Sequence, residues 1–195
     1  MGSREALMDS NWKSINNQLQ PLHQQLFRPI PSLLHSFETG EAFQHCTGCG
    51  KDLLAEKASY LVEKIFSKGE VIVEYAMCRD CLEPIRQEIS AESKEAIQKF
   101  HKERRKIFQN LEKCNFCLQP VEELVGYKMV ADCSGDQLFS LGHPTTLCGT
   151  CHGEMAEGIS EKTKKDLDKH RDKFVPDPPQ VAKDLPSVPL EEMPV

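Results

Sequence analysis

Residues 46–51 read Cys-Thr-Gly-Cys-Gly-Lys, and a second Cys-x-x-Cys pair follows at Cys78 and Cys81. Two residues between thiols allow a tight turn to direct both sulfurs at one metal ion, and two such turns supply the four thiolates of a tetrahedral zinc shell. The pattern then returns once more. Eight of the nine cysteines belong to these pairs: Cys46, Cys49, Cys78, Cys81, Cys114, Cys117, Cys148 and Cys151. The sequence therefore predicts two structural Zn²⁺ ions.

The two copies have nearly the same internal spacing, with 28 residues between the pairs of the first copy and 30 between those of the second. We expect each copy to bind its own ion. The alternative is a cross-brace, in which pairs one and three share one ion and pairs two and four share the other. A helix predicted between pairs two and three would hold them about 40 Å apart at 1.5 Å per residue, which favours sequential pairing.

Each copy predicts a zinc knuckle, then a β-hairpin, then a helix whose first turn carries the last two ligands. In the first copy the expected strands are 60–66 and 71–77, and the helix extends to about Leu111. In the second copy the strands are 124–131 and 137–141. The expected fold class is a small, metal-organised α+β protein with two treble-clef-like zinc modules joined by a long helix.

The ninth cysteine, Cys133, falls in the predicted turn of the second hairpin, and the last helix extends to about Phe174. Before the first knuckle, an apolar stripe that includes Trp12, Ile15 and Leu19 predicts a helix to about Gln20, with a short second helix after Pro31. The expected domains are a helical extension at 1–42, the first zinc module at 43–113, the second at 114–174 and a disordered, acidic, proline-rich tail at 175–195.

The run Cys46-x-x-Cys49-Gly50-Lys51, with a hairpin and a Cys-x-x-Cys helix after it, resembles treble-clef and zinc-ribbon-like fingers with four cysteine ligands. It is similar to the N-terminal zinc-binding domain of the bacterial ClpX unfoldase over about 40 residues of each copy. That domain is a small dimerising module that captures adaptors and substrates. The resemblance implies the fold and, by analogy, a homodimer that binds proteins. The longer hairpin and the second copy depart from that family.

Charge bears on the partner. The formal net charge is −6, and two filled four-thiolate sites would bring it to about −10, which disfavours binding to nucleic acid. The strongest basic stretch, the predicted helix 94–113, makes a nucleic-acid-associated regulator the alternative function. Its candidate contacts are Lys102, Arg104, Arg105 and Lys106. No apolar run is long enough to span a membrane and no signal peptide begins the chain, so we expect a cytoplasmic protein.

Cys148-Gly149-Thr150-Cys151-His152 also matches the motif that attaches c-type haem, which makes an electron carrier the third hypothesis. Four thiolates on each ion leave no open position for a substrate, and no convergent acid–base pair is evident, so we expect no enzymatic activity. The main hypothesis is a non-catalytic zinc scaffold that binds another protein.

Overall fold

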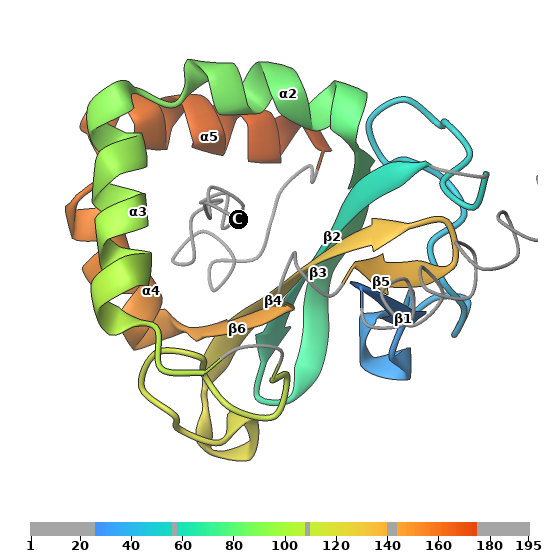
Figure 1. Ribbon diagram of the computed structural model, residues 1–195, viewed down its shortest axis with the longest axis horizontal. Helices are drawn as coiled ribbons and strands as arrows, with labels where there is room; N and C mark the ends of the chain where they lie inside the picture. The colour runs from blue at the N-terminus through green and yellow to red at the C-terminus, as the bar shows by residue number, and fades with distance from the viewer. Residues whose placement is uncertain (1–25, 56–57, 108–109, 140–143, 175–195) are drawn as a thin grey trace, which may run out of the picture.

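The computed structural model describes residues 26–55, 58–107, 110–139 and 144–174 (Figure 1). In this part of the chain, six strands form one antiparallel sheet in the order β1-β5-β4-β2-β3, with β6 also paired to β4. The strands are β1 (Phe27–Pro29), β2 (Ser59–Ser67), β3 (Glu70–Cys78), β4 (Gly126–Ser134), β5 (Gln137–Phe139) and β6 (Thr145–Cys148). The fold is thus a small mixed α/β arrangement on one sheet.

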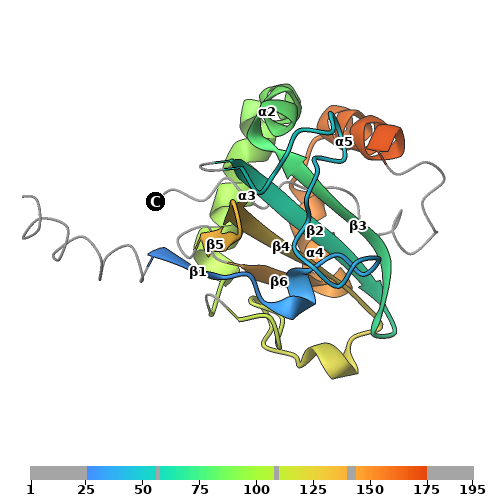
Figure 2. The ribbon, with the colours of Figure 1, turned by 90° about the vertical axis from the view of Figure 1, so that its right-hand side faces the viewer.

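Helices from both copies frame this sheet. Figure 1 shows α2 beside α5 along one side and α3 beside α4 along another, and Figure 2 again places α2 and α5 together. The helices are α2 (Arg79–Glu88), α3 (Ala91–Arg104), α4 (Gly149–Glu157) and α5 (Glu161–Phe174), with short 3-10 turns η1 (Ser32–Leu34) and η2 (Val121–Glu123). Each copy's first helix therefore packs on the other copy's second helix.

The first hairpin confirms the sequence prediction. Strands β2 and β3 contain the expected 60–66 and 71–77, and they are joined through Lys68 and Gly69, both with positive φ (52° and 84°). Such a two-residue turn matches the twist of the flanking strands. Glycine adopts this backbone conformation without the steric cost that a side chain brings.

The second hairpin differs from the prediction. Its first strand is β4, which runs to Ser134 and not to 131, and both β5 and β6 pair with the same edge of β4. The expectation that Cys133 lies in the turn is wrong: it belongs to β4, pairs with Tyr60 and Leu138 in register, and is 2% exposed. The turn comes two residues later, at Gly135 with φ 57°. Sequence pattern missed this because a polar residue on each side of Cys133 interrupts the hydrophobic run.

Strands β2 and β4 join the two copies into one sheet. Tyr60 pairs with Cys133 and Phe66 pairs with Tyr127, with Glu63 opposite Val130 at the middle of the register. Equivalent residues of the two strands are 67 positions apart, so this pairing is the one that an approximate twofold axis near Glu63 would produce. The domain boundaries at 43 and 114 remain predictions, because a shared sheet does not show whether either copy folds alone.

The long helix predicted to Leu111 is not present. Helix α2 ends at Glu88, Ile89 is extended (φ −68°, ψ 124°), and Ser90 caps α3, which ends at Arg104. The side chain of Ser90 accepts a hydrogen bond from the backbone N–H of Ser93, as an N-cap serine does. The short helix expected after Pro31 is only the 3-10 turn η1, and the helix expected before Gln20 lies outside the described residues.

Four hydroxyl groups meet where the bent helix pairs cross. Ser90 and Ser160 begin the second helix of each copy, and Ser93 and Thr163, three residues further on, are completely buried. Their oxygens lie 2.8–3.3 Å apart across both copies. The N–H of Ser90 donates to Thr163 Oγ1 and that of Ser160 donates to Ser93 Oγ. Each copy thus helps to cap the other's helix.

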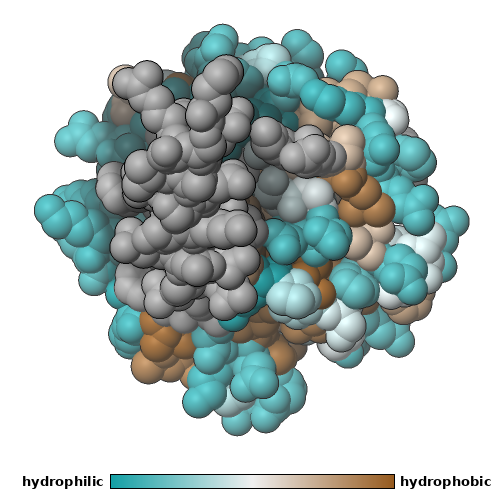
Figure 3. Space-filling model, turned by 45° about the vertical axis from the view of Figure 1, so that its right-hand side comes forward, coloured by the Kyte–Doolittle hydropathy of each residue, from teal (hydrophilic) through white to brown (hydrophobic). Residues whose placement is uncertain are grey.

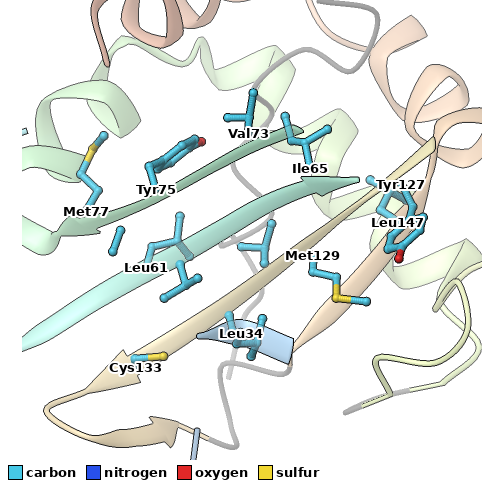
Figure 4. Close-up of a cluster of buried hydrophobic side chains, with 14 of the residues drawn as sticks. Leu34, Leu61, Ile65, Val73, Tyr75, Met77, Tyr127, Met129, Cys133 and Leu147 are labelled. Carbon is cyan, nitrogen blue, oxygen red and sulfur yellow. The ribbon is translucent and has the colours of Figure 1, made fainter. Parts of the chain in front are cut away.

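Both faces of β2 are buried. Alternation places Leu61 and Ile65 on the face opposite Tyr60 and Val62, a face for which the hairpin by itself has no covering layer. Leu61 and Ile65 are 4% and 1% exposed, and Leu61 lies with Ile85 of α2 and Leu167 of α5 around a common hollow. Figure 4 shows Leu61 and Ile65 among the buried side chains of the sheet, together with Leu34 from η1. The second copy's helix therefore covers the face that the sequence left open.

Candidate metal centres

Four thiols of the first copy converge where its knuckle meets the end of β3. The Sγ atoms of Cys46, Cys49, Cys78 and Cys81 all lie within 4.8 Å of one another, and Cys49 Sγ is 3.7 Å from Cys78 Sγ. Four sulfurs about 2.3 Å from a central ion form a tetrahedron with edges of about 3.8 Å. The spacing therefore suits one bound metal ion, and it exceeds the S–S bond length of a disulfide.

The second copy builds the same cluster. Its members are Cys114, Cys117, Cys148 and Cys151, again within 4.8 Å, with Cys117 Sγ 3.7 Å from Cys148 Sγ. All nine cysteines lie in the described part of the chain, and all are free thiols. The clusters group the pairs sequentially, as expected, and not as a cross-brace. Two four-cysteine clusters without disulfides indicate two bound metal ions.

Backbone hydrogen bonds shape both knuckles in the same way. The N–H of Cys46 donates to Lys51 O and that of Cys114 donates to Gln119 O, each at 2.9 Å. The left-handed position that closes the turn is Gly50 in the first knuckle (φ 72°). In the second knuckle it is Leu118 (φ 70°), where a side chain makes this conformation costly.

Sequence analysis missed the residues that fasten each knuckle to the sheet. The N–H of Thr47 donates to Ala76 O, and the N–H of Asn115 donates to Thr146 O, both at 2.8 Å. Their side-chain oxygens accept from the N–H groups of the same two strand residues. The available signal was a polar residue directly after the first cysteine of each knuckle. These paired bonds bring the knuckle within reach of the second Cys-x-x-Cys pair.

Backbone N–H groups lower the pKa of the first thiol of each knuckle, whereas the pKa values of the buried partner thiols Cys78, Cys148 and Cys151 are raised. The N–H of Cys78 donates to Cys46 Sγ at 3.3 Å, and the N–H of Cys148 donates to Cys114 Sγ at 3.5 Å. Burial raises the pKa of the Cys46 thiol, but N–H groups of Cys78 and its own turn outweigh burial and lower that pKa to about 7. Hydrogen bonds from Cys148 and Cys151 move the pKa of Cys114 far below its ordinary value. A deprotonated sulfur is the form that binds metal.

An aromatic ring shields each cluster, but the two rings come from different parts of the chain. In the first copy, a Cβ built on Gly48 would stand 3.1 Å from the ring of Phe174 and 3.2 Å from Cys81 Sγ, so α5 of the second copy occupies this place. The equivalent knuckle residue of the second copy is Phe116, which is 2% exposed. Its ring packs on Phe100 of α3, with the two centroids 5.1 Å apart.

The two clusters differ in exposure. In the first, Cys49 is exposed and Cys81 is half-buried, whereas in the second only Cys117 is exposed and Cys151 is 3% exposed. A chelator therefore has easier access to the first cluster.

The four predicted nucleic-acid contacts lie in different surroundings. Lys102, Arg104 and Lys106 are exposed, and Arg104 pairs with Glu154 at 2.5 Å. Arg105 is half-buried and donates to Thr145 Oγ1 at 2.6 Å, and burial lowers its pKa to about 10. Two of the four cations thus serve contacts within the protein.

The two cysteines of the haem-attachment motif, Cys148 and Cys151, both belong to the second thiol cluster. The histidine of that motif, His152, is completely buried on α4.

Among the described residues, no helix is long and apolar enough to cross a membrane. No known protein family, curated protein or solved structure matches this chain.

Proposed function

We propose that the protein is a non-catalytic zinc scaffold of the cytoplasm that binds another protein. The observation that carries the proposal is the pair of four-thiol clusters, each with tetrahedral spacing. Zinc is favoured because four thiolates in a tetrahedron suit Zn²⁺, and because thiols stay reduced in the cytoplasm. The first copy has a knuckle, then the hairpin β2–β3, then helix α2, and this order supports the treble-clef assignment that we propose for it.

A structural role follows from the donor set. Four protein thiolates complete the usual coordination of zinc, so neither ion would keep a position for water or substrate. Each ion would tie a knuckle to the end of a strand and to the first turn of a helix, since Cys78 and Cys148 directly precede α2 and α4. Metal binding would therefore supply folding free energy and not chemistry.

The surface supports a protein partner. Phe37 and Val125 are 77% and 72% exposed, far more than the other large apolar side chains in the described part of the chain. Val125 lies beside an open hollow of about 440 Å³ that Val121, Leu124 and Tyr127 also line. On the face in Figure 3, hydrophobic patches lie among hydrophilic side chains. Contiguous exposed apolar surface is a common feature of protein interaction sites, and the surface around Val125 is the candidate here.

Metal analysis of protein purified without chelator tests the zinc assignment. We expect two zinc ions per chain in the wild type and one in Cys49→Ser or Cys117→Ser. Cys133→Ser is the matched control, because this cysteine belongs to neither cluster, and it should keep both ions. Loss of both ions from Cys49→Ser alone, or iron in place of zinc, would contradict the proposal.

Affinity capture from the native cell tests the partner. The double variant Phe37→Ser/Val125→Ser should lose a captured protein while it retains two zinc ions and the circular dichroism of the wild type. Lys102→Met/Lys106→Met is the control for a charged surface. A capture that depends on these lysines, is released by moderate salt and contains nucleic acid would instead favour the alternative function.

A further inference from the structure

A narrow hollow of about 50 Å³ lies between helices α2 and α5 and the hairpin β2–β3. Its lining is mostly apolar and includes Leu61, Leu82, Ile85 and Leu167. One carboxylate, that of Glu63 on β2, also lines it. Since one water molecule takes about 30 Å³ in the liquid, the hollow has room for the end of a small chain molecule.

The carboxylate of Glu63 lacks hydrogen-bond donors. Glu63 is only 3% exposed, and its Oε2 lies 3.8 Å from Lys128 Nζ, which is an ion-pair distance but too long for a hydrogen bond. Its Oε1 is buried and has no hydrogen-bond partner in the part of the chain that the structure describes. A buried acceptor without a donor costs free energy, so the oxygen calls for an explanation.

The approximate twofold axis shows which group is missing. Glu63 pairs with Val130 at the middle of the register, and strand residues of the two copies correspond at 67 positions. The counterpart of Lys128 is therefore Leu61. These two residues lie on opposite sides of the axis, so Glu63 meets an ammonium on one side only. On the other side an apolar residue takes the equivalent position, and the hollow lies beside it.

The cationic side chains that line the hollow already have carboxylate partners. Arg171 pairs with Asp168 at 2.9 Å and with Asp172 at 3.0 Å, and His170 Nε2 lies 2.7 Å from Glu88 Oε2. These contacts direct both side chains toward carboxylates of the helices. Two carboxylates on one guanidinium also leave an excess of negative charge beside the hollow, which favours a cationic ligand.

We propose that this hollow binds the end of a small aliphatic primary amine, whose ammonium donates a hydrogen bond to Glu63 Oε1 and whose alkyl chain packs on Leu61 and Leu82. An ammonium has three donors and no acceptor, and its hydrogen bonds to a carboxylate are strengthened by charge. The ligand would supply on this side of the axis the group that Lys128 supplies on the other. This site is separate from both thiol clusters and does not depend on the proposed function.

NMR titration of the zinc-loaded full chain with n-propylamine at neutral pH tests the site. 1-Propanol has a donor without the charge, and ethyltrimethylammonium has the charge without a donor. We expect saturable binding of propylamine with a dissociation constant on the order of 1 mM, because so small a ligand makes few contacts. The two analogues should bind at least tenfold more weakly, since a hydrogen bond between charged groups supplies more than the energy of a tenfold change. The methyl signals of Leu61 and Leu82 should shift. Absence of saturable binding, equal affinity for 1-propanol, or shifts confined to other residues overturns the proposal.

Variants locate the binding. Glu63→Gln should weaken propylamine at least tenfold, because it removes the charge and keeps the size of the side chain. Leu61→Lys places an ammonium at the position equivalent to Lys128, and Leu82→Phe narrows the hollow without a new charge, so each should abolish binding. Glu70→Gln, an exposed carboxylate on the same hairpin, is the matched control and should bind like the wild type. Wild-type affinity in Glu63→Gln and Leu82→Phe, with zinc content and circular dichroism unchanged, would show that the hollow is not the site.

Discussion

The two copies, residues 46–104 and 114–174, build the same four-thiol cluster. The aromatic ring that shields the cluster comes from a different copy in each case. The first knuckle has Gly48 and receives the ring of Phe174 from the second copy's last helix. The second knuckle has its own ring, Phe116, which packs on Phe100 of the first copy's helix α3. Each cluster therefore needs the other copy's second helix. The position beside each knuckle therefore requires an aromatic ring, which either the knuckle itself or a helix of the other copy can supply.

Loss of a metal ion from either cluster should have the largest effect on stability. Structural zinc in finger peptides is bound with apparent free energies on the order of 10 kcal/mol, comparable to the total stability of a domain. Cys81→Ser and Cys151→Ser should each lose one ion and several kcal/mol of stability. With a chelating dye, zinc release from the wild type should be biphasic, with the first copy's ion in the fast phase because Cys49 is exposed and Cys81 half-buried. If Cys81→Ser retains the fast phase, the assigned order is wrong.

Substitution of the aromatic rings beside the clusters should have the second largest effect on stability. Phe116→Ala should cost about 3 kcal/mol, because it leaves a cavity at a completely buried site. Phe174→Ala should cost less, since this side chain is only half-buried. Gly48→Phe should be strongly destabilising alone, because its side chain would enter the space of Phe174, and Phe174→Ala should partly restore stability. Urea unfolding of the two single variants and the double variant measures this coupling.

The two copies should differ in how their contribution to stability changes at acidic pH. His101 and its counterpart Arg171, 70 positions later, are both buried on the second helix of their copy. Burial lowers the pKa of His101 to about 4, so the histidine is neutral when folded, whereas Arg171 forms an ion pair with Asp168 at 2.9 Å. In the unfolded chain His101 binds a proton below its ordinary pKa of about 6.5. Its contribution to stability is therefore present above pH 6.5 and is lost as pH falls toward 4.

The full loss from this histidine would be about 3 kcal/mol. His101→Leu should flatten the decline of stability between pH 6.5 and 4, measured by urea unfolding with zinc content followed in the same samples. Lys102→Met, the adjacent exposed position, should keep the wild-type slope. An unchanged slope in His101→Leu would assign the acid sensitivity to other groups.

The smallest effect concerns the closing residue of each knuckle. Gly50 and Leu118 have nearly the same φ, 72° and 70°, but only glycine adopts it without steric cost. Leu118→Gly should raise stability by about 0.5–1 kcal/mol, whereas Gly50→Ala should lower it by about 1 kcal/mol. Thermal unfolding at constant zinc content measures both. A loss of stability in Leu118→Gly would mean that the packing of this 40% exposed side chain outweighs its strain.

Local pattern determined the ligands and the first hairpin. Cys-x-x-Cys spacing places two sulfurs at one turn whatever surrounds it, and the alternating strands at 60–66 and 71–77 need only a two-residue turn between them. Sequential pairing was predicted from one long helix between pairs two and three, and the structure replaces that helix with α2 and α3. The clusters are sequential for a different reason, because each joins a knuckle to the strand end and the helix of its own copy. These features depend on contacts between residues close in sequence, which spacing and periodicity record.

Tertiary structure decided the rest. The segment after Cys81 is predicted as one helix to about Leu111, yet α2 ends at Glu88 and a second helix begins after Ser90. At this break the backbone N–H of Ser90 donates to Thr163, 73 residues later in the chain. Cys133 belongs to a strand because Tyr60 pairs with it, and the hairpin face of Leu61 is covered because α5 returns from the other copy. Such contacts join residues far apart in the chain. Their free energy depends on what each segment meets in space, so local periodicity determined the parts of this protein and only packing determined their arrangement.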